Sequence, residues 1–241
     1  MRILVISLMT LFVLSCSNVR MLEKSFNKIK APVEYLHDSR ISDSKKTDSI
    51  YVSFNIMPLE NQTSVTKIDG TTIPLLFFNH ISTDVKVVLG QNSIKQNYNN
   101  FFISSFFDES SRTGNYILSN QPLNSSSYTM VITVDSCITQ SQYMKSSTSI
   151  FLLLAYSYTA TEAGLAAVTN LKVTSVLKKG DIIVNQKSYS IYNTQPFLKT
   201  QSDSIDEMRS DFISNMAESL SLGTKECIEK IITDINSSIN N

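Results

Sequence analysis

The chain has 241 residues and a mass of 27.0 kDa, and its 21 basic and 21 acidic residues give a formal net charge of zero. This length suits one or two ordinary globular domains. Charged residues make up only 17 % of the chain, which disfavours a nucleic-acid binder that relies on neutralising phosphates. Two His and three Cys also leave too few side chains for most metal sites and most Cys/His catalytic arrangements.

The first sixteen residues have the pattern of an export signal. Arg2 supplies one positive charge, an apolar run covers residues 3–14, and Ser15 and Cys16 follow. The run is shorter than the roughly 20 residues that a membrane-spanning helix needs. The sequence Val-Leu-Ser-Cys at residues 13–16 resembles the lipobox of bacterial lipoproteins. The alternatives are an ordinary secretory signal with a chance cysteine and an apolar N-terminal helix.

The lipobox resemblance implies that residues 1–15 form a signal peptide that is removed, and that Cys16 is the lipidation site. In that family the cysteine receives diacylglycerol and its new amino group is acylated, for example with palmitate. Several acyl chains hold a protein firmly on a membrane, because each buried CH₂ contributes about 0.8 kcal/mol. Ser17 stands where an Asp resembles an inner-membrane retention signal in some enteric bacteria. We therefore expect the protein to be anchored in the envelope of a Gram-negative bacterium, on the outer membrane rather than the inner one. Its domain would then lie in the periplasm or at the cell surface.

Cys137 and Cys227 are the thiols that remain in the mature chain beyond the anchor. An oxidising compartment permits a disulfide between them, and two buried free thiols are the alternative.

The mature chain divides into two parts by composition. Residues 16–49 are rich in Ser, Lys and Asp and have few periodic apolar positions, so we expect a lipid anchor followed by a flexible tether. Residues 50–241 have the alternating and helical patterns of a single α+β domain. The N-terminal part of that domain begins with alternating apolar residues over Ile50–Ile56, which predict a strand.

The middle of the domain mixes clear and ambiguous segments. Residues 59–91 suit strands or an extended excursion. A helix is expected to start at Asn92 or Ser93 and to end before Gly114, because apolar residues recur there every three to four positions. A strand with one buried face is expected at residues 128–134.

The C-terminal part predicts a hairpin and a long helical region. Residues 171–177 and 182–192 flank a turn in which Gly180 takes a positive φ. Ser204 can cap a helix, and Gly223 interrupts its apolar stripe, so that a second helix or a bent extension follows. The resulting fold class is α+β, a mostly antiparallel sheet with helices packed on one face in a two-layer sandwich.

One segment does not follow this pattern. Residues 150–158 are apolar without alternation, which favours a central strand buried on both faces. The alternative is that residues 150–168 form a lipid-facing or partner-facing element. In that case the candidate apolar contact surface comprises Leu152, Leu153, Tyr156 and Tyr158.

The chain has none of the common catalytic or nucleotide-binding motifs. His37 falls in the predicted tether and His80 stands alone, so neither is expected to have a partner that would orient it as a base. We therefore expect no enzymatic activity, no cofactor and no metal site.

The order of elements resembles small periplasmic lipoproteins: the auxiliary lipoproteins of ABC-type transport systems and the lipopolysaccharide-assembly lipoprotein. The resemblance rests on the strands at residues 50–56 and 128–134, the hairpin around Lys179-Gly180-Asp181, and the helix from Ser204. It implies a noncatalytic accessory or assembly component that docks on a protein partner in the cell envelope. Residues 59–91 and 150–158 depart from the pattern of these families.

A ligand-binding lipoprotein that captures lipid or glycan is the alternative function. A lipid binder would need an apolar cavity, which the pairs Phe101-Phe102 and Phe106-Phe107 could line. A glycan binder is less expected, because the chain has no Trp for a stacking platform.

Overall fold

A computed structural model describes residues 19–37, 48–75, 77–121, 128–152, 155–197 and 204–239. The elements in chain order are β1 (Asp48–Ile56), β2 (Ser64–Leu75), β3 (Phe78–Val88), the short 3-10 helix η1 (Gln91–Ser93), α2 (Tyr98–Thr113), β4 (Tyr116–Ser119), β5 (Tyr128–Leu152), β6 (Ala155–Gly164), β7 (Ala167–Lys179), β8 (Ile182–Gln195) and α3 (Ile205–Ile239). The predicted α+β class is confirmed.

The described strands form one eight-stranded sheet around β5, which is 25 residues long. The first half of β5 pairs with β1 and β7, and its second half pairs with β3 and β6. Only β1 runs parallel to its neighbours, β4 and β5, so the sheet is mixed but mostly antiparallel. The long strand β5 therefore connects two halves of the sheet, and it pairs with different strands in each half.

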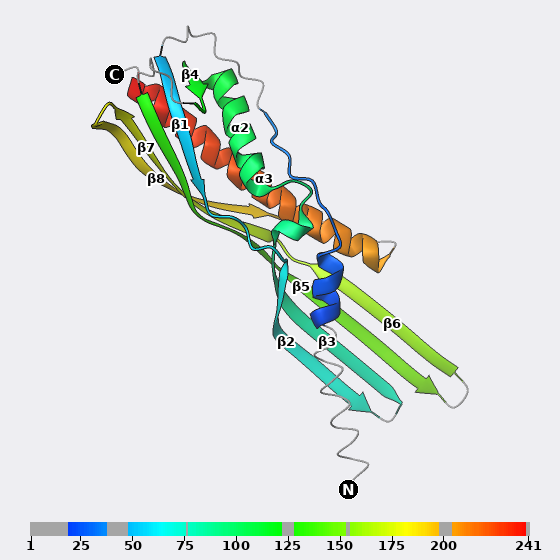
Figure 1. Ribbon diagram of the computed structural model, residues 1–241. Coiled ribbons are helices and arrows are strands. Elements are labelled where there is room, and N and C mark those ends of the chain that lie inside the picture. The colour runs from blue at the N-terminus through cyan, green and yellow to red at the C-terminus, as the bar shows by residue number, and fades with distance from the viewer. Residues whose placement is uncertain are drawn as a thin grey trace.

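The helices α2 (Tyr98–Thr113) and α3 (Ile205–Ile239) cover only one of these halves. Figure 1 shows α2 and α3 on one face of the half that contains β1, β4, β7 and β8, whereas β2, β3, β6 and the second half of β5 extend beyond the helices. The predicted two-layer arrangement is present where the helices lie. The rest of the sheet is a projection that the sequence did not predict.

Strand alternation and helical stripes place the core as expected. On β1, Ile50 and Val52 are buried. The predicted inward face of β5 and the apolar stripes of α2 and α3 are buried as well, at Tyr128, Met130, Ile132, Val134, Phe101, Phe102, Phe106, Met208, Phe212, Met216 and Leu220. The turn between β7 and β8 has Gly180 at φ 59°, which confirms the predicted hairpin.

Two helix boundaries differ from prediction. The helix α2 begins later than Asn92 or Ser93, because the side chain of Asn97 accepts hydrogen bonds from the backbone N–H groups of Asn99 and Asn100 and caps it. The helix α3 runs unbroken through Gly223. A Cβ at Gly223 would lie 3.1 Å from Cγ2 of Thr169, so the glycine allows α3 to approach β7 closely.

Residues 19–37 belong to the folded domain, although we expected them in the tether. A helix covers residues 19–26, and its Leu22 and Phe26 are fully buried. Ala31 and Val33 are also buried, and Ala31 forms a bridge with Ile94. The segment is mostly polar, so its few apolar residues did not predict burial. They are buried because the rest of the fold packs against them.

None of the described helices combines the length and the apolar character that crossing a bilayer requires.

Candidate interaction surface

The projecting half of the sheet is here called the blade: β2, β3, residues 140–152 of β5, and β6. Its strands lie in the order β2-β3-β5-β6, and all its pairings are antiparallel. The blade contains the strands of both segments that depart from the lipoprotein resemblance, residues 59–91 and 150–158, together with the neighbouring parts of β5 and β6. The two departures in sequence are therefore one feature in space.

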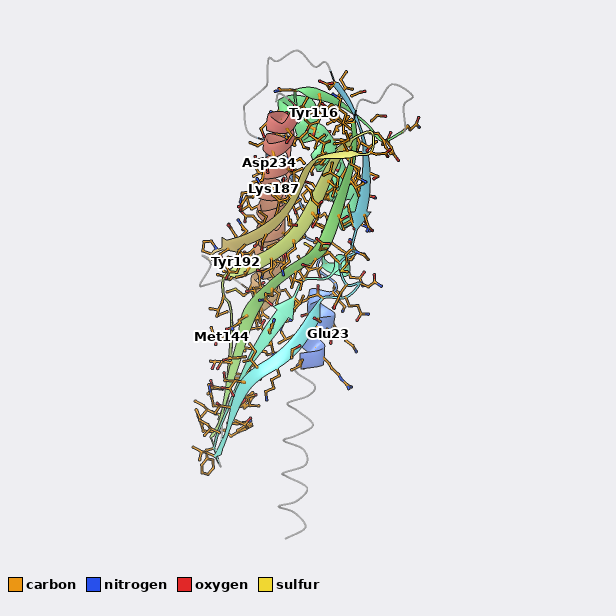
Figure 2. All side chains as sticks on the ribbon, turned by 90° about the vertical axis from the view of Figure 1, so that its left-hand side faces the viewer. Glu23, Tyr116, Met144, Lys187, Tyr192 and Asp234 are labelled. Carbon is orange, nitrogen blue, oxygen red and sulfur yellow. The ribbon has the colours of Figure 1, made fainter. Side chains whose placement is uncertain are left out.

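The outer part of the blade has no buried core, whereas Val85, Val87 and Tyr143 at its base are buried. None of the described side chains at residues 66–82 or 144–161 is buried. Figure 2 shows this half edge-on as a thin layer with side chains on both sides, with Met144 on it and Glu23 on the helix beside its base. A sheet that is exposed on both faces gains little from apolar burial, so its stability depends on its hydrogen bonds and on its attachment to the domain.

The two hairpins of the blade end side by side. The backbone N–H of Phe151 donates to the carbonyl of Phe77 at 2.8 Å, which joins the β5–β6 hairpin to the β2–β3 hairpin. The rings of Phe151 and Tyr156 contact each other with centroids 5.0 Å apart. We call this end of the blade the tip; its exposed apolar side chains are Ile73, Leu75, Phe77, Ile150, Phe151, Tyr156 and Tyr158.

The contact surface predicted from sequence lies at this tip. Tyr156 is 62 % exposed and Tyr158 is 55 % exposed. Leu152 ends β5, but its side chain, like all of Leu153, lies outside the described residues. The preferred interpretation of residues 150–158 as a buried central strand is wrong, because the described side chains of this segment are exposed and none of the described helices covers this part of β5 and β6.

The other half of the tip was not predicted from the sequence. Ile73, Leu75 and Phe77 come from the β2–β3 hairpin and are 43 %, 64 % and 57 % exposed. A signal for it exists in the sequence, since residues 70–83 and 146–161 are both free of Asp, Glu, Lys and Arg. Two uncharged segments with apolar centres that pair in space produce one apolar end.

A row of charged side chains crosses the blade and is the last level with charge before its hairpin ends. Asp69 of β2 pairs with Asp84 of β3, and Asp84 pairs with Met144 of β5. The next residue, Lys145, pairs with Glu162 of β6. We call Asp69, Asp84, Lys145 and Glu162 the charged row. From Asp84 to the end of β3 at Phe78 there are six steps of about 3.4 Å, so the uncharged end of the blade is about 20 Å long.

Glu162 fixes the base of the blade to the domain. Its carboxylate accepts hydrogen bonds from Nε and Nη2 of Arg209 at 2.7 and 2.6 Å and from the hydroxyl of Tyr143 at 2.6 Å. The Glu162 side chain is 1 % exposed, and Lys145 Nζ lies 3.7 Å away. Burial, and then the hydrogen bond to Glu162, raise the pKa of Tyr143. These contacts join β5, β6 and the first turn of α3.

The guanidinium of Arg209 stays charged in this setting. Burial by itself would lower the pKa of Arg209, but hydrogen bonding and attraction from Glu162 outweigh it and raise that pKa. The group is therefore a fixed positive partner for a buried carboxylate.

Of the other candidate residues, His80 lies on β3 of the blade, whereas Cys137, Cys227 and His37 lie away from it. Cys137 and Cys227 are free thiols, and burial raises the pKa of each to about 12. His37 has a partner after all, because its Nδ1 lies 2.9 Å from Oε2 of the buried Glu109. His80 also has one, since its Nδ1 lies 2.9 Å from Oγ1 of Thr148. The proposed lipidation site Cys16 lies outside the described residues.

The phenylalanines that could have lined a lipid cavity contribute to the core instead. Phe101, Phe102 and Phe106 are buried, and Phe54 of β1 packs against Phe102 and Phe106. In the described part of the chain, no group of three or more His, Cys, Asp or Glu side chains is placed to hold a metal ion.

No family model matches the chain, and no curated protein matches its sequence. Among solved structures, the chain is similar to a crystal structure of a Xanthomonas campestris protein of the family DUF330. The two share 10 % sequence identity, with a TM-score of 0.42 over 88 % of this chain and 99 % of that one.

Proposed function

We propose that the chain is a noncatalytic lipoprotein of the Gram-negative cell envelope that acts as an accessory or assembly component of an envelope complex. Acyl chains on Cys16 anchor it, on the outer membrane in preference to the inner one, with the domain in the periplasm or at the cell surface. The lipobox at residues 13–16 supports the anchor.

One observation supports the accessory role above all: the blade is a convex projection with an apolar tip. Sites for small substrates are concave and enclose their ligand. A thin sheet that extends beyond the helices presents its side chains outward, which suits contact with a large surface. The tip contains seven exposed large apolar side chains within two adjoining turns: Ile73, Leu75, Phe77, Ile150, Phe151, Tyr156 and Tyr158.

The alternative, a lipid- or glycan-binding lipoprotein, has less support. The side chains that would have lined a lipid cavity, Phe101, Phe102 and Phe106, are packed in the core. The depression between the sheet halves near Lys86 and Gln142 is open and is lined mainly by polar groups and small aliphatic side chains.

Affinity capture from cross-linked cells tests the proposal. The full-length chain with a C-terminal tag would be compared with Cys16→Ala and with an unrelated tagged lipoprotein. We expect an identified envelope transporter or outer-membrane protein to be enriched reproducibly with the native chain and to be lost with Cys16→Ala. Enrichment of nothing beyond what the unrelated lipoprotein captures would contradict the accessory role.

The anchor is tested in the same material by intact mass. The native chain should lack residues 1–15 and carry the added mass of diacylglycerol and an amide-linked acyl chain on Cys16. A purified chain that ends at another residue, or that lacks lipid, would overturn the lipoprotein assignment.

A further inference from the structure

The blade changes composition in order from its base to its end. The charged row is followed by a band of hydroxyl side chains, which comprises Thr71, Thr72, Ser82, Thr83, Ser146, Ser147, Thr148 and Ser149. The apolar side chains of the tip begin within this band, where Tyr158 pairs with Ser149, and end beyond it at Phe77, Phe151 and Tyr156. A change from charged to hydroxyl to apolar side chains suits the passage from water through lipid headgroups to the acyl boundary.

The open edges of the blade limit how deeply it could enter a bilayer. The strands β2 and β6 each pair with a strand on one side only. Unpaired backbone groups at a sheet edge are not tolerated within hydrocarbon. Only the last residues of each hairpin, such as Phe77 and Phe151, can therefore leave the headgroup region. A depth of 5–10 Å is typical of elements that lie in this interface.

The N-terminal helix brings positive charge to the base of the blade. Arg20 and Lys24 are exposed one turn apart on the helix over residues 19–26, and the exposed Lys28 follows it. This helix contacts both the blade and α3. The ring centroid of Phe26 lies 5.2 Å from that of Tyr143 and 5.6 Å from that of Phe212. Anionic headgroups attract such basic side chains, whereas an apolar groove of a protein offers them no favourable electrostatic interaction.

The N-terminal end of the helix over residues 19–26 is the end nearer the tip. From its other end the chain runs along the helical layer, where the N–H of Glu34 donates to Ser221 and His37 meets Glu109. In Figures 1 and 2 the helix lies beside the base of the blade, and its N-terminal end points in the direction of the tip. Eight residues at 1.5 Å each span about 12 Å, a little more than half the length of the uncharged end of the blade.

Cys16 lies three residues before Val19, which spans at most about 10 Å of extended chain. Three residues of extended chain are therefore long enough to cover most of the distance from Val19 to the level of the tip. We propose that the tip of the blade enters the headgroup region of the bilayer on which the chain is anchored, with Arg20 and Lys24 facing anionic lipids. This inference rests on the proposed lipidation of Cys16 and adds a second membrane contact, which fixes the orientation of the domain.

The absence of Trp from the sequence allows a direct test with a single fluorescent reporter. Phe151→Trp places the reporter at the tip, and Tyr192→Trp places it on β8, where the native side chain is 68 % exposed. The full acylated chains are purified from membranes and reconstituted in vesicles of phosphatidylethanolamine and phosphatidylglycerol. The vesicles contain lipids that are brominated near the headgroup end of their acyl chains.

We expect the Phe151→Trp emission to shift to shorter wavelength and to lose roughly half of its intensity, because the ring lies within the interface. The Tyr192→Trp emission should keep its aqueous wavelength and intensity. Tyr156→Trp is a second tip reporter, and circular dichroism checks that each variant is folded. Equal emission and equal quenching at positions 151, 156 and 192 would overturn the proposal.

A photo-reactive phenylalanine at position 151 in living cells distinguishes lipid from protein as the occupant. Cross-links to lipid support the bilayer contact, whereas cross-links to one envelope protein would overturn it in favour of a protein groove. The vesicles contain no other protein, so the Trp result does not depend on whether the accessory role is correct. Conversely, a failed Trp test with normal acylation and partner capture would reject only the membrane contact of the tip.

Discussion

The carboxylate of Glu162 on β6 accepts two hydrogen bonds from the guanidinium of Arg209 on α3, although 47 residues separate them in sequence. The pair lies where the blade meets the helical layer, and Tyr143 of β5 donates a third hydrogen bond to the same carboxylate. A buried carboxylate with three donors is stable only while its partners remain. The Glu162 carboxylate therefore links β6, β5 and α3 at the attachment of the blade.

Replacing Arg209 with Met should destabilise the protein strongly. The change leaves Glu162 buried without its guanidinium, which costs about 3–5 kcal/mol when one partner of a buried pair is removed. Lys230→Met is the matched control, because the pair of Lys230 and Glu226 is exposed and contributes less than about 1 kcal/mol. Urea unfolding measures both, and equal losses in the two variants would show that the buried pair has no special role.

The two cysteines should be inert toward alkylation in the folded protein. Burial raises the pKa of Cys137 and Cys227 to about 12 from an ordinary value of 9.0. The thiolate is the reactive form, and a rise of three pH units lowers its population about a thousandfold. Maleimide at pH 7.5 should label both thiols in denaturant and neither in the native state. Rapid native labelling at either position would contradict the packing of that residue.

Alkaline pH should destabilise the domain through the same thiols. Their folded pKa lies above the unfolded value, so their contribution to stability is complete below about pH 9 and is lost as pH rises toward 12. Buried Tyr98, whose pKa is raised mainly by burial, acts in the same direction above pH 10. Thermal midpoints under reducing conditions between pH 7 and pH 11 test this.

The matched variant for the alkaline experiment is the double change Cys137→Ala and Cys227→Ala. It should start from a lower midpoint at pH 7, because the substitutions leave space in the core. Its midpoint should then fall less steeply than that of the native protein between pH 9 and pH 11. Parallel curves for the two proteins would indicate that the thiols do not contribute to the alkaline loss.

Gly90→Ala should be more damaging than Gly180→Ala. A Cβ at Gly90 would lie 2.2 Å from the carbonyl carbon of Gln62 and 2.4 Å from the nitrogen of Thr63, and backbone atoms cannot yield cheaply. At Gly180 a Cβ meets nothing within 4 Å, and the cost is the strain of φ 59°, about 1 kcal/mol. Free energies of unfolding from urea titrations rank the two, and a reversed order would contradict the close approach at Gly90.

The sequence by itself determined those features that depend on local periodicity. Alternation on Ile50–Ile56 and Tyr128–Val134 predicted which faces of β1 and β5 are buried, because successive strand residues point to opposite faces. The buried stripe of α3 and the turn at Gly180 were also predicted from the local sequence. Each of these signals comes from residues within a few positions of one another.

Only the tertiary structure decided where the remaining apolar segments lie. The run at residues 150–158 has the composition of a buried strand, yet its described side chains lie at the exposed tip, because β3 and β6 pair with a part of β5 that none of the described helices covers. Leu22 and Phe26 are buried for the converse reason, since α3 and β5 provide a surface for a short polar helix. Burial depends on partners that are distant in sequence, and local periodicity contains no information about them.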